Sequence, residues 1–508
     1  MAKRFPRLVA IFILWSLVCL GSAAAAPAED RLAGIDQFIA QVMGDWQVPG
    51  LAVAVVKDGQ IIFTQGFGVS QVKTGQKVTP DTIFGIGSCT KAFTATVLGT
   101  LVDQGKLNWD TPARDYIPFF KMYDEYVTAH LTLRDMLTHR TGLARYDSLL
   151  SDIPQTRKEI VDRLQYLEPN KGFRSAFEYS NIMYVVAGFL AEQVSGQTWE
   201  DLVRARILTP LNMKSTNFSP DEMQKAPDFA LPYREEKGVV KQIPFAQIKA
   251  AGPAGSINSN VRDMANWLQA WLNKGQLNDK KIITEKTWQD ILTPQVIASG
   301  RVEFDEKSFS AYALGWMVTT YQGRLMVTHE GEIDGFHSSV SFLPRDNIGV
   351  VVLVNKSDSC PVPGMVVYNA YDRLLGLPAA PWNQRIKQIF AFKKEAEAKQ
   401  KAEKKRNRKT GTKPSHPLDA YGGTYGHPAY GFITVTPEGD RLKVTTGDKS
   451  TFLTHYHYDV FETAEEPPEL AGLRLTFITG PAGDIASVSA PLEHGVKDIV
   501  LTRMTDKK

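Results

Sequence analysis

A serine and a lysine three residues apart are the residues in this sequence best suited to covalent chemistry. Ser88 and Lys91 follow two glycines, Gly85 and Gly87, and precede an apolar run over 92–102 that is typical of a buried helix. Residues three apart on a helix share a face, so the lysine amine can approach the serine hydroxyl. A buried lysine that does not hold its own proton can accept the serine proton. The pair therefore predicts acyl transfer through Ser88, with helix-start N–H groups favouring negative charge on the attacked oxygen.

The same spacing occurs a second time, in Ser70 and Lys73. We interpret that second pair as part of a solvated loop. The spacing alone is a weak signal, so the interpretation of Ser88 depends on its partners elsewhere in the chain.

A tyrosine and an asparagine open a second apolar helix. Tyr179 and Asn181 directly precede the run 182–190. A phenol beside a lysine ammonium can be held nearer its anionic form, and it can then relay a proton between nucleophile and leaving group. The Asn181 amide can hold both a substrate carbonyl and the Lys91 side chain. The alternative is an ordinary helix-capping cluster.

A third group, His329, Gly331 and Glu332, follows a strand-like run over 325–328. A histidine at a strand end is usually a hydrogen-bonded structural residue. Glycine after it, however, lets a substrate backbone approach the strand edge closely. The N–H of Glu332 would then be the second oxyanion donor beside that of Ser88.

Together these three elements resemble the serine β-lactamase and penicillin-binding-protein superfamily. The Tyr-x-Asn form of the second motif is similar to the class C β-lactamase branch, and the resemblance runs from about Asp36 to Leu377. The resemblance implies these roles: Ser88 as acylated nucleophile, Lys91 as its activator, Tyr179 as general base and acid, Asn181 as substrate contact, and His329 in the first place of the third motif.

The third motif departs from the superfamily pattern, because His-Glu-Gly stands where typical β-lactamases have Lys-Thr-Gly. Two literal Lys-Thr-Gly tripeptides, 73–75 and 409–411, lie in the wrong places along the chain. Loss of the fixed lysine charge argues against a β-lactam or D-alanine carboxylate as the preferred ligand. Variants with His-x-Gly include esterases and D-amino-acid-specific peptidases. The substrate class stays open among small molecules and peptides, with D-amino-acid and cell-wall peptides among the candidates.

The order of strand-like and helical runs predicts an α+β fold. Two strand-like runs near the N-terminus and three far downstream indicate one antiparallel five-stranded sheet flanked by helices, with a large helical insertion between them. The five runs are 51–56, 61–64, 325–328, 337–343 and 348–355.

Composition changes mark four segments. We predict a signal peptide over 1–26, a β-lactamase-like hydrolase domain over 30–380, a basic charged linker over 384–416 and an all-β domain over 417–508. The linker is expected to be a solvated helix or disordered, with attraction to anionic envelope polymers or lipid head groups as the alternative. The last segment resembles the lipocalin-like domain appended to some of these peptidases, and its recurring short strands indicate a meander or small barrel.

The 508 residues carry a net charge of only +3, and the signal peptide implies export to the periplasm or medium. We therefore expect no nucleic-acid partner, no transmembrane segment after cleavage, and two buried free thiols, Cys89 and Cys360. A homo-oligomer is compatible with the sequence. His455 and His457 lie two apart on one strand, but no ligand with matching spacing accompanies them, so we expect no metal and no cofactor.

The sequence thus predicts an exported serine hydrolase that cleaves an amide or ester through a Ser88 acyl-enzyme. The alternative is a non-catalytic penicillin sensor or ligand-binding protein of the same fold.

Overall fold

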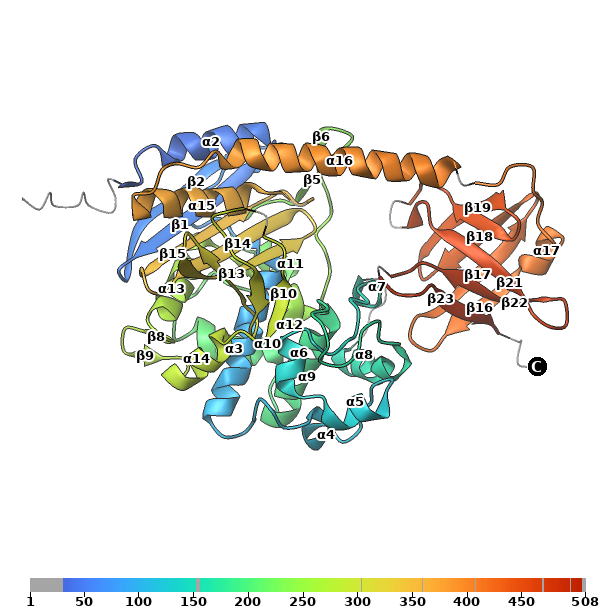
Figure 1. Cartoon of the computed structure of the whole chain (residues 1–508), viewed down its shortest axis with the longest axis horizontal. Coiled ribbons are helices and arrows are strands. Elements are labelled where there is room, and N and C mark those ends of the chain that lie inside the picture. Colours follow the sequence, from blue (N-terminus) through green and yellow to red (C-terminus); the bar gives the residue numbers. More distant parts are fainter. Residues whose placement is uncertain are drawn as a thin grey trace, which may run out of the picture.

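The protein consists of a large α+β body and a separate β-barrel, joined along one side by a long helix (Figure 1). The computed structural model describes residues 31–151, 156–302, 304–358, 360–406, 408–467, 470–493 and 495–504. The predicted signal peptide, 1–26, lies outside the described residues. Within them, no helix is both long and apolar enough to cross a bilayer.

A nine-stranded antiparallel sheet forms the centre of the large body, in the order β10-β11-β12-β13-β14-β15-β1-β2-β3. The five predicted strands are neighbours in its middle: β13 (Arg324–Ile333), β14 (Phe336–Leu343), β15 (Ile348–Val354), β1 (Gly50–Lys57) and β2 (Gln60–Gln71). The predicted number of five strands is wrong, because short strands extend both ends: β10 (Val296–Ser299), β11 (Ser310–Tyr312), β12 (Met317–Tyr321) and β3 (Gln76–Lys77). Runs of two to five residues give too little period-2 pattern to be recognised.

Helices cover both faces of the sheet, and strand β1 shows how. Its alternate residues Ala52, Ala54 and Val56 pack into a core with helices α3 (Thr90–Asp103) and α13 (Val261–Leu272). The residues between them pack on the opposite face against α2 (Ile35–Asp45) and α15 (Val362–Leu375). Burial on both faces explains why this strand is continuously apolar instead of alternating.

The segment between β4 and β10 forms the expected helical insertion beside the sheet. Besides α3 and α13, its α-helices are α4 (Ala113–Tyr116), α5 (Glu125–His130), α6 (Leu133–Leu137), α7 (Ser148–Ser151), α8 (Arg157–Arg163), α9 (Asn181–Ser195), α10 (Trp199–Val203), α11 (Pro220–Met223), α12 (Gly252–Gly255) and α14 (Glu285–Leu292). Helix α9 is buried all round from Ile182 to Ala191, which accounts for its uniformly apolar sequence.

A two-stranded ladder connects the insertion to the segment just before helix α3. Strand β4 (Phe84–Gly85) pairs with β7 (Asn258–Ser259), and the chain then enters a short 3-10 turn, η1 (Gly87–Cys89), before α3. The insertion also carries two small hairpins, formed by β5 (Tyr233–Glu236) with β6 (Val239–Gln242) and by β8 (Gln276–Leu277) with β9 (Lys280–Lys281).

The C-terminal part is a closed eight-stranded barrel, so of the two predicted arrangements the barrel is the observed one. Six of its strands match the strand-like runs of the sequence, 432–436, 441–445, 451–458, 473–478, 485–489 and 498–502, whereas β16 and β20 were not recognised. The strands are β16 (Gly423–His427), β17 (Gly431–Glu438), β18 (Arg441–Thr446), β19 (Lys449–His457), β20 (Val460–Thr463), β21 (Arg474–Thr479), β22 (Ile485–Ala490) and β23 (Ile499–Arg503). A short helix, α17 (Leu418–Tyr421), precedes them.

Helix α16 (Trp382–Arg406) occupies most of the segment predicted as a linker (Figure 1). It begins as part of the large body, because Trp382 is fully buried against the α2–α15 core and Ile386 packs at its edge. From Lys393 to Gln400 its side chains are exposed, and the helix then leads to the barrel. The charged half of the segment is thus a solvated helix, whereas its first turns are packed.

Candidate active site

Ser88 lies on the η1 turn, held between the sheet and the insertion. The Ile86 N–H donates to the Ile257 carbonyl at 2.9 Å, and the Cys89 N–H donates to the Ile86 carbonyl at 3.2 Å. Gly87 has φ +48°, and a Cβ atom there would lie 2.8 Å from the backbone nitrogen of Glu332. The two glycines before Ser88 therefore permit a tight approach of this turn to strand β13.

Lys91 is fully buried and directly contacts the nucleophile. Its Nζ lies 2.9 Å from Ser88 Oγ and donates to the Ala254 carbonyl at 2.8 Å. Burial, with a smaller contribution from the positive charge of Arg145, lowers the pKa of Lys91 well below its usual value. A neutral amine has a lone pair, so Lys91 is able to accept the proton of Ser88.

Tyr179 lies on the other side of the same pair. Its ring centroid is 4.9 Å from Lys91 Nζ, and its hydroxyl is hydrogen-bonded to Ser88. Burial raises the pKa of Tyr179 above its usual value, against a smaller lowering by the Ser88 hydrogen bond. The expectation that a lysine ammonium holds this phenol near its anionic form is therefore wrong, because burial disfavours both the phenolate and the ammonium.

Asn181 is oriented by an aspartate that the sequence did not single out. Its Nδ2 donates to Asp147 Oδ1 at 2.9 Å. Because a carboxylate only accepts hydrogen bonds, the amide oxygen must point away from Asp147. That oxygen is buried and has no hydrogen-bond partner among the described residues. The expected hydrogen bond between Asn181 and Lys91 is not present there, since the backbone carbonyl of Ala254 takes that place.

His329 continues strand β13 instead of ending it, since β13 reaches Ile333. Its Nδ1 faces the Glu330 carbonyl at 2.6 Å, and its Nε2 lies 2.7 Å from the Tyr312 hydroxyl. A carbonyl only accepts, so Nδ1 carries the proton and Nε2 accepts from Tyr312. Burial lowers the pKa of His329 to about 4. The side chain is thus neutral, and it is both hydrogen-bonded and part of the wall beside Ser88.

Beyond His329, strand β13 has an open edge next to Ser88. Strand β12 pairs with β13 only as far as Thr328, whereas β14 pairs with it as far as Ile333. An open edge at this position is consistent with the prediction that a substrate backbone approaches strand β13. The reason given for Gly331 is wrong, however, because a Cβ atom there would meet the Ile86 carbonyl oxygen at 1.9 Å. Gly331 makes room for the nucleophile turn, not for substrate.

Substituting Gly331 by alanine should therefore displace Ser88. We expect a loss of about 1–3 kcal/mol in the free energy of unfolding from overpacking. A shift of the nucleophile turn should also lower kcat by roughly 100-fold. Urea unfolding and the rate of Ser88 labelling by a fluorophosphonate measure both effects. Gly44→Ala is the control, since a Cβ at Gly44 meets no atom within 4 Å. Equal behaviour of the two variants would contradict the steric role of Gly331.

Several residues of the site were missed at the sequence level. The Arg145 Nε donates to Asp147 Oδ2 at 2.7 Å, and the Arg145 guanidinium carbon lies 5.1 Å from the Tyr179 ring centroid. The His139 ring lies 4.3 Å from the Tyr179 ring, and its Nδ1 accepts from the Ser180 N–H at 3.0 Å. His139 belongs to the segment Thr-His-Arg-Thr-Gly, residues 138–142, which resembles the Thr-His-Thr-Ser-Gly segment of the class C branch, and this resemblance was the available signal. No sequence pattern pointed to Arg145 or Asp147.

Ser88 lies where two hollows meet. One of about 630 Å³ extends past Tyr312 and His329 toward helices α15 and α16. The other, of about 300 Å³, is bordered by Asp147, Asn181 and the small residues of α12. A substrate can thus place a group on each side of the nucleophile.

The described residues offer no cluster of side chains that could bind a metal ion. In the part of the chain that the structure describes, no three His, Cys, Asp or Glu residues are arranged to hold a metal ion. His455 Nε2 lies 2.8 Å from the Tyr458 carbonyl, within the barrel. Cys89 and Cys360 are buried and free of disulfides, as predicted.

The neutral state of His329 predicts a pH-dependent stability. Its pKa is about 4 when folded and about 6.5 when unfolded, so the unfolded chain binds the extra proton between these values. Stability should fall as pH decreases through that window, by up to about 3 kcal/mol from this group. Urea unfolding at pH 7 and pH 4.5 should show a smaller pH difference for His329→Gln than for the wild type. Equal pH differences in the two proteins would contradict this assignment.

Comparison with known proteins agrees with this architecture. The sequence profile of the family described as Beta-lactamase matches residues 35–365, and a domain of unknown function, DUF3471, matches residues 407–503. An unguisins hydrolase of Aspergillus campestris is 31% identical over 462 residues, covering 84% of this chain and 83% of that protein. The Staphylococcus aureus protein flp is 26% identical over 339 residues, 64% of each chain.

Solved structures show the same fold. An octameric penicillin-binding protein homologue from Pyrococcus abyssi superposes with a TM-score of 0.60 at 23% identity, covering 93% of this chain and all of that one. A structure described as SurE gives a TM-score of 0.56 at 18% identity, covering 94% of this chain and 99% of that one. The match of the family profile over most of the large body confirms the resemblance drawn from the motifs, and the chain belongs to the beta-lactamase family.

Proposed function

We propose that this protein is a serine hydrolase that cleaves an amide or ester bond through an acyl-enzyme on Ser88. The observation that carries the proposal is the buried Lys91 amine 2.9 Å from Ser88 Oγ, with a pKa that burial lowers. Fungal relatives named as hydrolases support the general activity.

Burial favours the neutral forms of Lys91 and Tyr179, and acyl transfer needs both groups in those forms. Ser88 Oγ attacks the substrate carbonyl carbon, and its proton passes to Lys91 Nζ. The N–H groups of Ser88 and Glu332 hold the resulting oxyanion. The leaving group departs with a proton from the Tyr179 hydroxyl, and the Lys91 ammonium reprotonates Tyr179. Water then attacks the acyl carbonyl by the same route, releasing the acid and free Ser88.

The charge around the site favours a neutral group near Ser88. His329 adds no charge where typical β-lactamases have lysine, and Arg145 is paired with Asp147. We propose peptides or esters as substrates, in preference to carboxylated β-lactams. A D-amino-acid residue is the first choice for the acyl part, since one neighbouring structure is described as SurE with D-Leu. An exported location, from the predicted signal peptide, is part of the proposal.

A substrate panel tests the function. Wild type and Ser88→Ala are compared on p-nitrophenyl acetate, D-alanyl p-nitroanilide and a chromogenic cephalosporin. We expect a burst and steady turnover on the first two and slow turnover on the third, all lost in the variant. A burst without turnover would instead support the non-catalytic sensor. Faster hydrolysis of the cephalosporin than of the ester would refute the preference for neutral substrates.

The oligomeric state is a separate question. The Pyrococcus abyssi neighbour is described as octameric, which supports a homo-oligomer here. Size-exclusion chromatography with light scattering would measure it directly.

A further inference from the structure

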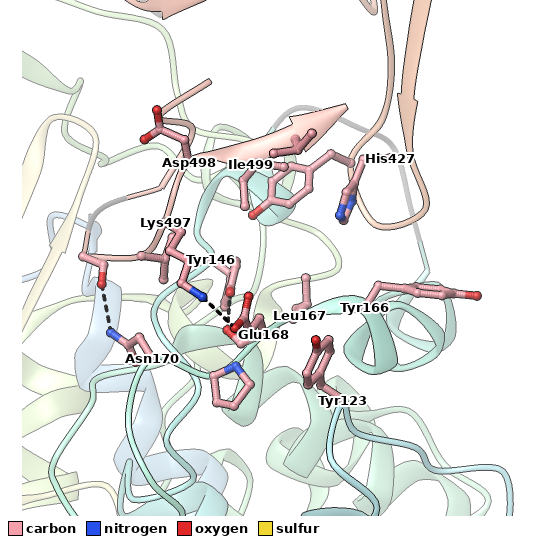
Figure 2. Close-up of a pocket in the computed structure, with 15 residues that line it drawn as sticks. Tyr123, Tyr146, Tyr166, Leu167, Glu168, Asn170, His427, Lys497, Asp498 and Ile499 are labelled. Atoms are coloured by element: carbon pink, nitrogen blue, oxygen red, sulfur yellow. Dashed lines mark hydrogen bonds and ion pairs between the residues drawn. The ribbon is translucent and has the colours of Figure 1, made fainter. Parts of the chain in front are cut away.

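The C-terminal barrel contacts the large body directly, in addition to being connected to it through α16. Ala429 of the barrel is fully buried within the main hydrophobic core of the large body, and Tyr430, Val496 and Ile499 pack against that core. A cleft of about 680 Å³ lies between the two parts (Figure 2). The barrel thus contacts the large body directly through a small apolar cluster.

Polar contacts join the same two surfaces. Lys497 Nζ donates to Glu168 Oε1 at 3.0 Å, and Asn170 Nδ2 donates to the Gly495 carbonyl at 3.2 Å (Figure 2). The Tyr146 hydroxyl donates to the Glu168 carbonyl beside them. Tyr146 is therefore anchored at the rim of the cleft, one residue from both Arg145 and Asp147.

One barrel residue reaches the loop that borders Ser88. The Glu493 carboxylate accepts hydrogen bonds from the Ser148 hydroxyl and, at 3.0 Å, from the Tyr430 hydroxyl. Ser148 begins helix α7, which lies on the side of the large body facing the barrel (Figure 1). The loop before it needs such support, because Tyr146 has φ +48°, which non-glycine residues rarely adopt.

From this loop the contacts continue to the reacting groups. Asp147 holds the Asn181 amide at 2.9 Å and the Arg145 side chain at 2.7 Å. Arg145 in turn lies over the Tyr179 ring. Residues 145–148 therefore connect Glu493 of the barrel to both Asn181 and Tyr179.

We propose that the barrel is a positioning domain for the active site, and that Glu493 is a positioning residue that fixes Arg145, Asp147 and Asn181 through Ser148. Its loss should release residues 145–151 and loosen the contacts that orient an extended substrate. Ser88 and Lys91, held by η1 and α3, should be affected less. The proposal gives a function to a domain matched only as one of unknown function.

Amide hydrogen exchange tests the positioning without requiring turnover, so it is independent of the proposed hydrolase function, on which only the kinetic readout below depends. In Glu493→Ala, exchange of residues 145–151 should be at least tenfold faster than in the wild type. Glu493→Gln keeps a hydrogen-bond acceptor and should restore protection. Glu462→Ala is the control, because Glu462 pairs with Arg474 inside the barrel at 3.2 Å. Unchanged exchange in Glu493→Ala, or the same change in the control, would overturn the proposal.

Kinetics supply the second readout. In Glu493→Ala, kcat/KM for D-alanyl p-nitroanilide should fall about tenfold more than the rate of fluorophosphonate labelling of Ser88, with KM carrying most of the loss. Ser148→Ala removes the hydroxyl but keeps the backbone hydrogen bond of residue 148 to Glu493, so it should lose less, and the double variant should lose no more than Glu493→Ala alone. Equal losses in both assays, or additive losses in the double variant, would show that Glu493 acts only on stability.

Discussion

Replacing Ser88 by alanine should abolish covalent labelling by a fluorophosphonate and lower kcat/KM by about 10⁴-fold or more. Ser88 is the serine in contact with a buried amine, with Oγ 2.9 Å from Lys91 Nζ. Without the hydroxyl no acyl-enzyme forms, and only the binding and oxyanion contacts remain to assist attack by water. Intact-protein mass spectrometry and steady-state kinetics measure the two effects.

Ser70→Ala is the matched control, because Ser70 and Lys73 repeat the same spacing. The structure places Ser70 fully buried on strand β2, where its hydroxyl contacts the Gln76 carbonyl at 3.4 Å, and places Lys73 in the turn that follows, so the interpretation of the pair as a solvated loop is wrong for Ser70. Labelling should therefore be unchanged in Ser70→Ala. A probe attached to any serine other than Ser88 would refute the assignment of the nucleophile.

Lys91→Met and Tyr179→Phe should each lower kcat by about 10²–10⁴-fold, the usual range for acid–base groups. In the proposed mechanism Lys91 accepts the serine proton, helped by a pKa that burial lowers, and Tyr179 returns a proton to the leaving group, helped by a pKa that burial raises. The two groups would thus relay the same proton. The double variant should therefore lose much less than the product of the single losses.

Tyr184→Phe is the control for this prediction. The Tyr184 ring lies 5.3 Å from Lys91 Nζ, but its hydroxyl donates to the Leu137 carbonyl at 2.6 Å. Its loss should cost about 1 kcal/mol of stability and little rate. Fully multiplicative losses for Lys91→Met with Tyr179→Phe would contradict a shared proton path.

Local patterns in the sequence were sufficient for the parts of this protein that short-range geometry determines. The spacing of Ser88 and Lys91 gave their contact because a helical turn brings residues three apart together. The apolar runs gave the five central strands and the buried helices, since burial demands apolar side chains. The order of the three motifs along the chain identified the family.

Only the tertiary structure decided the pKa shifts of the reacting groups and the contacts that hold these groups in place. Burial lowers the pKa of Lys91 and raises that of Tyr179, which no spacing reveals. Gly331 is required by the Ile86 carbonyl, which is distant in sequence. Asp147 and Glu493 likewise gain their roles from partners 34 and 345 residues away along the chain. Contacts between such distant segments depend on how whole elements pack, so a local pattern carries no trace of them.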